Sequence, residues 1–375
     1  MSTLSLPNTP EQKYEVTPLE LFFDLVFVFA VSQLSQHLLA DRSWRGAAQT
    51  LVLLLAVFAV WFYTSWAATL IPADHPRTRG MVLAVMLLGL FMNASVAGAF
   101  ATAGWAFLVP FLLIQLGRTV WTLVNAPDAV FRNHFARTLV WLIATSPAWI
   151  VGAAVSPEAR LVWWAVAAGL DLLGTWLAHP IPGRWLRSAH VAFQGGHLLE
   201  RCSQFLLIAL GETVVTTATA IAATPMTLLT VVTGTAALAG IVALWALGFG
   251  RAYGLTARHV QQTRDPVHAS RHAGNALMAM VAGLIAVAVA NEEVIAHPQA
   301  DASAALSLLL YGGPILFLVA QGWYFWAVLQ VRPRLRLVGS AALVLVGFAA
   351  VWVPPYVALI LAGASLTTLA ILDRP

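Results

Sequence analysis

Twelve long apolar segments constrain this chain more than any other feature of its sequence. A helix needs roughly 20 apolar residues to cross the hydrocarbon core of a bilayer, where it satisfies its own backbone hydrogen bonds. We therefore expect an all-α fold, a polytopic integral membrane helical bundle with about twelve transmembrane helices. Segments six and twelve are short, so ten spans is the alternative count. The segments lie at 19–40, 47–70, 80–103, 105–124, 136–155, 160–178, 202–223, 227–249, 272–296, 302–330, 335–353 and 356–372.

The composition excludes a soluble globular protein and a disulfide-stabilised one. Of the 375 residues, 60% are hydrophobic and 10% are charged, and Cys202 is the single cysteine. Little of the chain lies outside the apolar segments, so we expect the lipid bilayer as its partner and no nucleic acid. The sequence has no phosphate-binding glycine loop, no serine-nucleophile elbow and no haem signature. We therefore expect no cofactor.

The positive residues predict the orientation of the chain in the membrane. With twelve spans, sixteen of the twenty Lys and Arg residues fall on one side, three fall on the other, and Arg118 lies inside a span. Cytoplasmic loops carry such an excess of positive charge. We predict a multi-pass protein of the cytoplasmic membrane with both termini in the cytoplasm and with the first apolar segment as its own insertion signal.

The order of the segments suggests two halves. We predict a cytoplasmic N-terminal segment at 1–18, a first six-helix half at 19–178, a cytoplasmic connector at 179–201 and a second six-helix half at 202–372. Weak matches between the halves suggest a 6+6 parallel repeat, an arrangement known from secondary transporters. The matches pair Gln115 with Gln321, Trp61 with Trp245 and Asp24 with Glu212.

An acidic residue stands inside the first apolar segment. Thr17 and Pro18 predict the start of a helix, and Asp24 follows within two turns. A carboxylate in hydrocarbon costs about 2.5 kcal/mol or more, so Asp24 must face a partner or water. Glu20 lies one turn earlier on the same face, which suggests an aqueous approach from the cytoplasm. A purely structural role for Asp24 is the alternative.

Three motifs resemble those of the bacterial low temperature requirement protein A family. The first is E-L-F-F-D-L-V-F-V-F-A-V-S-Q-L-S from Glu20 to Ser35, and the second begins at Glu200-Arg201 and ends in L-G-E-T-V-V around Glu212. The third is the A-H-P ending of segment nine at 296–298. The resemblance implies a multi-pass membrane protein and no particular reaction. Segment eight departs from the family pattern at 244–251, where an expected acidic residue is missing.

The second motif adds further candidates for a site. Helical spacing places His197 and Glu200 on one face, and we expect Glu200 and Arg201 at the cytoplasmic interface. Glu212 then lies roughly 18 Å deeper, from a rise of 1.5 Å per residue. The alternative for Glu200 and Arg201 is a plain interfacial ion pair. The alternative for Glu212 is a structural role, as a hydrogen bond to a neighbouring helix. His197 and Glu200 supply only two metal ligands, so we expect no metal.

Arg118 is the one Arg inside a span, and it shares a polar stripe with Gln115. A buried Arg needs a counter-ion. The candidates are Asp24, Asp171 and Glu212. The pair is either structural, most simply with Asp171, or part of a gate or substrate site.

The deeper aromatic and amide side chains are candidates for the lining of a cavity. We expect Trp61 and Trp245 to lie deeper than the aromatic residues near the ends of the segments, where tryptophan more often anchors a helix at the interface. Asn93 and Gln321 lie near the middle of theirs, and they either bond neighbouring helices or, like Gln115, line the cavity.

Two functions fit these residues best. The first is a secondary transporter of an unidentified small molecule, coupled to protons if Asp24 and Glu212 meet in a wet pocket between the halves. The second is a membrane-embedded enzyme that uses Asp24 and Glu212 as an acid/base pair on a lipid-like or prenylated substrate. The lack of a nucleophile or metal motif argues against hydrolysis. A membrane sensor or scaffold without turnover is a third option.

Overall fold

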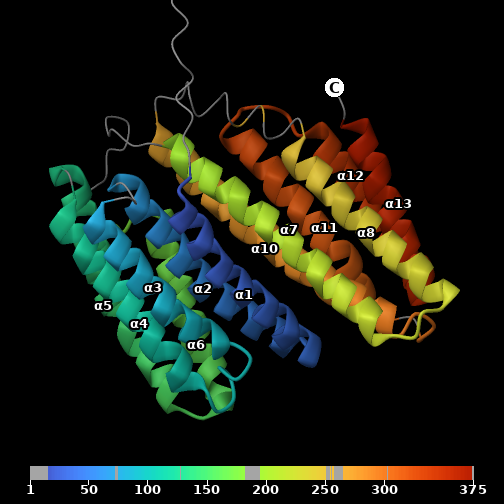
Figure 1. Cartoon of the computed structure of the whole chain (residues 1–375), viewed down its shortest axis with the longest axis horizontal. Coiled ribbons are helices and arrows are strands. Elements are labelled where there is room, and N and C mark those ends of the chain that lie inside the picture. The colour runs from blue at the N-terminus through green and yellow to red at the C-terminus, as the bar shows by residue number, and fades with distance from the viewer. Residues whose placement is uncertain are drawn as a thin grey trace, which may run out of the picture.

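The computed structural model describes residues 16–71, 75–126, 128–181, 195–250, 254, 256, 265–301 and 303–373. These residues form twelve long α-helices (Figure 1). In chain order they are α1 (Pro18–Ala40), α2 (Trp44–Leu70), α3 (Pro76–Ala94), α4 (Gly104–Asn125), α5 (Ala129–Ala154), α6 (Pro157–Trp176), α7 (Gly195–Ala223), α8 (Leu228–Phe249), α10 (Pro266–Ala296), α11 (Ala304–Ala327), α12 (Arg334–Ala350) and α13 (Pro355–Leu372).

The predicted fold class is confirmed, because each of the twelve apolar segments is a helix in the part of the chain that the structure describes. Ten of these helices are long and apolar enough to cross a membrane. The other two are α6, which carries Arg160 and Asp171, and α12, which has 17 residues. Both run alongside their neighbours in Figure 1. Most of the predicted N-terminal segment and connector, namely 1–15 and 182–194, lies outside the described residues.

The start of α1 follows directly from its sequence. Thr17 is the N-cap and Pro18 occupies the first turn, as predicted. Glu20 completes a capping box, since the backbone N–H of Thr17 donates to Glu20 Oε2 at 2.9 Å and the Thr17 side chain accepts from the Glu20 N–H. This cap holds the Glu20 side chain at the end of the helix, which matters for the site below.

The helices form two groups that meet along a seam. In Figure 1, α1 to α6 lie on one side and α7 to α13 lie on the other. The groups touch where α1 and α2 pack against α7 and α10, and α2 and α10 are the most deeply buried spans. Within the second group, α10 and α11 come closest where Gly283 faces Gly313. The division into two domains and the 6+6 repeat stay predictions.

Candidate functional site

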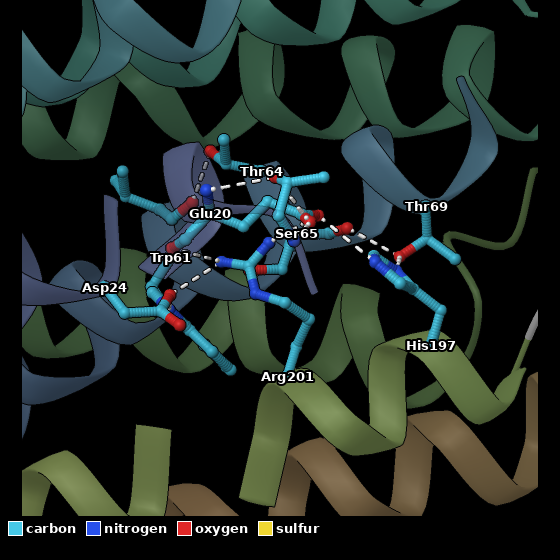
Figure 2. Close-up of polar contacts among 10 residues, drawn as sticks. Glu20, Asp24, Trp61, Thr64, Ser65, Thr69, His197 and Arg201 are labelled. Atoms are coloured by element: carbon cyan, nitrogen blue, oxygen red, sulfur yellow. Dashed lines mark hydrogen bonds and ion pairs between the residues drawn. The ribbon is translucent and has the colours of Figure 1, made fainter. Parts of the chain in front are cut away.

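A buried cluster of charged side chains lies on the seam, where α1 meets α7 (Figure 2). Glu20 and Asp24 stand one turn apart on α1, and His197 and Arg201 stand one turn apart on α7. Residues four apart share a helix face. Two such faces therefore bring four titratable groups together, although α1 and α7 are about half the chain apart.

Arg201 is the centre of the cluster. Its Nη1 lies 3.0 Å from Glu20 Oε1 and its Nη2 lies 2.6 Å from Asp24 Oδ1. The side chains of Arg201, Glu20 and Asp24 are 1%, 1% and 0% exposed. The planar guanidinium presents separate N–H groups to the two carboxylates, and this fork lets one Arg bridge them.

Contacts from α2 and α7 complete the cluster. Trp61 donates its indole N–H to Asp24 Oδ1 at 2.7 Å. His197 Nε2 lies 3.3 Å from Glu20 Oε1, and His197 Nδ1 lies 3.1 Å from the hydroxyl of Thr69 on α2. The ring of Trp61 also packs on Phe205 of α7, with centroids 4.3 Å apart. The cluster is thus held by three helices from both groups.

The cluster carries two carboxylates against one guanidinium, so its net charge is −1 when His197 is neutral and zero when one proton is added. One oxygen is free to take that proton. Asp24 Oδ2 is buried and has no hydrogen-bond partner among the described residues. Asp24 Oδ2 is therefore the position in the cluster at which a proton can be added without breaking a hydrogen bond.

Glu212 is not part of the cluster, which corrects the expectation that it meets Asp24 in a shared pocket. It is half-buried and lies 11 residues after Arg201, roughly 16 Å along α7. The Asp24 carboxylate contacts Arg201 and Trp61 instead. Arg201 was expected at an exposed interface beside Glu200, but it is buried. Successive helical residues point about 100° apart, so Arg201 faces α1, while Glu200 accepts from Gln204 at 3.3 Å.

Arg118 has no carboxylate within ion-pair distance in the described ranges, so the expected pairs with Asp24, Asp171 or Glu212 are wrong. Its guanidinium donates to the Val60 carbonyl at 3.2 Å and to Gln115 Oε1, and it lies over the ring of Tyr63. Asp171 instead accepts from Thr145 and Trp149. Gln115 and Arg118 therefore bond to each other, and Arg118 also bonds to the backbone of α2.

The candidates for cavity lining divide between the core and the surface. Trp61 is buried in the cluster, whereas Trp245 is 49% exposed on the outer face of α8, which corrects its expected place in a cavity. Asn93 donates to the Val26 carbonyl of α1 at 2.8 Å, a bond between packed helices. Gln115 and Gln321 both line cavities.

Arg336 is one of the sixteen charges expected on the cytoplasmic side, and it is not among the predicted site residues. It is buried, and it donates to Gln321, to the Leu247 carbonyl at 3.1 Å and to Asp373 at 2.8 Å. The signal in the sequence for a buried role was the position of Arg336 at the start of an apolar segment. The contacts of Arg336 resemble those of Arg118, which also joins a Gln to a backbone carbonyl. The 6+6 repeat nevertheless stays a prediction.

An ion pair and a hydrogen bond also join the two groups near the far end of α1. Arg42 pairs with Glu293, and Gln36 donates to Glu292 at 3.3 Å. Glu293 also lies 3.6 Å from His297, so this contact involves the third motif. These side chains are partly exposed. Among the residues that the structure describes, no group of three or more His, Cys, Asp or Glu residues could hold a metal.

Comparison with known proteins decides the family. The profile of the bacterial low temperature requirement A protein (LtrA) family matches residues 15–371. The chain belongs to the LtrA family. It is also 30% identical over 330 residues to an uncharacterized protein of Rhizobium meliloti (strain 1021), covering 86% of this chain and 80% of that protein. No solved structure matches it.

Family membership and the apolar helices together make this LtrA protein a multi-pass membrane protein. The first two family-like motifs supply the four charged residues at the centre of the seam cluster, or stand directly beside them. The third motif borders the contact near the far end of α1, because His297 lies beside Glu293. Residues of the first two motifs therefore meet at α1, although they are far apart in the sequence.

Proposed function

We propose that this LtrA protein is a secondary transporter of the cytoplasmic membrane that moves a small molecule and couples its movement to protons. The observation that carries the proposal is the cluster of Glu20, Asp24, His197 and Arg201 between the two helix groups, in which all but His197 are fully buried. Ionisable residues inside a membrane are costly, and they mark proton relays and substrate pathways. In many transporters, one bundle rocks against the other around such a site.

The cluster is suited to act as a proton-sensitive latch. When Asp24 is ionised, its bond to Arg201 holds α1 against α7. A proton on Asp24 removes the charge attraction and brings the cluster to zero net charge, so separation of the groups then costs less. With the predicted orientation, this latch lies on the cytoplasmic side and the Arg42–Glu293 contact lies on the external side.

Asp24, Glu20 and His197 replace the pair of Asp24 and Glu212 as coupling residues in this proposal. The enzyme hypothesis needs Asp24 and Glu212 on one substrate, but Asp24 bonds to Arg201, and Glu212 lies roughly 16 Å further along α7, which gives this hypothesis no support. Localisation in the cytoplasmic membrane and both termini in the cytoplasm stay part of the proposal.

Alternating access can be tested without knowledge of the substrate. Cys202 is buried beside the cluster, whereas Gln36 is exposed at the opposite end of α1. We expect Asp24→Asn, which mimics the protonated acid, to raise the rate of Cys202 alkylation by about tenfold, a shift of about 1.4 kcal/mol. The second reporter is made by Gln36→Cys in a protein whose own cysteine is removed by Cys202→Ser. In this background, Asp24→Asn should lower the rate at which an impermeant maleimide labels the introduced cysteine. Mass spectrometry of membranes measures both rates.

The two reporters distinguish three outcomes. Reciprocal changes support the transporter, no change at either site indicates a rigid scaffold, and faster labelling at both sites indicates loss of the fold. The last two outcomes contradict the proposal. Asp301→Asn is the matched control, because this exposed carboxylate lies in the loop before α11 and should change neither rate.

A further inference from the structure

A second polar site lies inside the first helix group, in a cavity of about 50 Å³ between α2, α4, α5 and α6, with α10 closing one side. A cavity of this size holds a few water molecules or a small ion, at roughly 10–15 Å³ per water. Asp171 lines it, together with the polar side chains of Gln115, Tyr63, Thr175, His179 and Asn275. The seam cluster contributes no residue to this lining.

Asp171 reaches the cavity as a hydrogen-bond acceptor. Thr145 donates to Asp171 Oδ1 at 2.7 Å, and the indole N–H of Trp149 donates to Oδ2 at 2.9 Å. An indole nitrogen can only donate, and two donors on one carboxyl group stabilise its charged form. Each carboxylate oxygen can accept a second hydrogen bond. No Lys, Arg or His lies within 4 Å of Asp171 in the described residues, so its charge is uncompensated there.

Aromatic rings form much of the wall around this carboxylate. Phe111 and Trp149 lie with their centroids 4.8 Å apart, and Phe58 and Phe62 stack at 6.0 Å. Tyr63 adds a third side, and its hydroxyl lies 2.8 Å from that of Thr175. Aromatic faces attract cations, and a desolvated ring contributes about 2 kcal/mol to such binding.

Two guanidinium groups of the described residues oppose a cation here, because Arg118 and Arg271 both act on Tyr63. Neither is among the residues that line the cavity. Arg118 donates to Gln115 Oε1 and to the Val60 carbonyl, and it lies over the Tyr63 ring. The side chains of Gln115 and Tyr63 therefore stand between Arg118 and a cation at Asp171.

We propose that this cavity binds a small organic ammonium ion, with Asp171 as its counter-ion and the rings of Trp149, Phe111 and Tyr63 around it. An ammonium group supplies the donors that the free lone pairs of Asp171 and the hydroxyls of Tyr63 and Thr175 accept. The role of the cavity as the substrate site rests on the proposed transport function. The binding itself does not.

Equilibrium binding to the purified full-length protein tests the assignment, with ethylammonium as the probe and titration calorimetry as the measurement. We expect saturable binding to the wild type and an affinity about 30-fold or more lower in Asp171→Asn, as for loss of one partner of a buried charge pair. Glu158→Gln is the matched control, because it removes an exposed carboxylate from the same helix. Its affinity should stay within about twofold of the wild type.

A second measurement uses the wild type alone, in case Asp171→Asn does not fold. Ethylammonium should raise the thermal unfolding temperature, whereas acetamide and acetate, which are of similar size but neutral and anionic, should not. Equal effects of the three compounds, no binding by the wild type, or unchanged binding by folded Asp171→Asn would each overturn the proposal. Ammonium binding without reciprocal cysteine labelling retains this site and removes the transporter. Reciprocal cysteine labelling without ammonium binding retains the transporter and removes this site.

Discussion

Replacing Arg201 by alanine is expected to destabilise the folded protein by about 3–5 kcal/mol. The substitution leaves Glu20 and Asp24 without a counter-ion at positions that are 1% and 0% exposed. An uncompensated buried charge costs far more than the ion pair contributes when both partners are present. Reversible unfolding in sodium dodecyl sulfate, followed by circular dichroism, measures the change in the free energy of unfolding.

The far end of the same helix provides the control for Arg201. Arg42 pairs with Glu293, but its side chain is 45% exposed. Arg42→Ala should therefore cost about 1 kcal/mol or less. Removing the carboxylates as well, in Glu20→Gln/Asp24→Asn/Arg201→Met, should restore part of the stability that Arg201→Ala loses. Equal losses for Arg201→Ala and Arg42→Ala would contradict the assignment of a buried cluster.

Replacing Gly283 by alanine is expected to cost about 1–3 kcal/mol, the range for an overfilled core, and Gly283→Val should cost more. A Cβ atom on Gly283 would lie 2.5 Å from the Gly313 carbonyl oxygen, and one on Gly313 would lie 2.7 Å from the Gly283 oxygen. Both obstacles are backbone atoms, which cannot rotate away. Therefore α10 and α11 would have to separate. Small residues allow such close approach between membrane helices.

Gly117 tests whether this effect comes from packing or from the residue type. It lies within α4, and a Cβ atom there would meet nothing within 4 Å. Alanine favours a helix over glycine by about 1 kcal/mol, so Gly117→Ala should be neutral or stabilising in the same unfolding assay. A loss of stability at Gly117 as large as that at Gly283 would refute the packing explanation.

Much of the fold could be predicted because helix formation in lipid is a local property. Each apolar run is long enough to span a bilayer and must satisfy its own backbone, so its position and type follow from hydropathy alone. The start of α1 is local as well, since Thr17, Pro18 and Glu20 make their capping contacts within one turn. The twelve helices of the described residues match the twelve predicted segments for this reason.

The partners of the buried charges could not be predicted in the same way. The sequence showed that Asp24 and Arg118 each need a partner, but not which one. Asp24 bonds to Arg201 across 177 positions, and Arg118 bonds to amide and carbonyl oxygens rather than to an acid. Trp61 and Trp245 looked equivalent, yet the first is buried on the seam and the second is exposed.

The sequence by itself therefore determined the helical membrane architecture and the residues whose charge demands an explanation. Only the tertiary structure decided that Glu20, Asp24, His197 and Arg201 form one cluster and that Asp171 faces a separate aromatic cavity. The physical reason is that hydropathy and helical period act within one helix. The choice of neighbours depends on shape and charge complementarity among all the helices together.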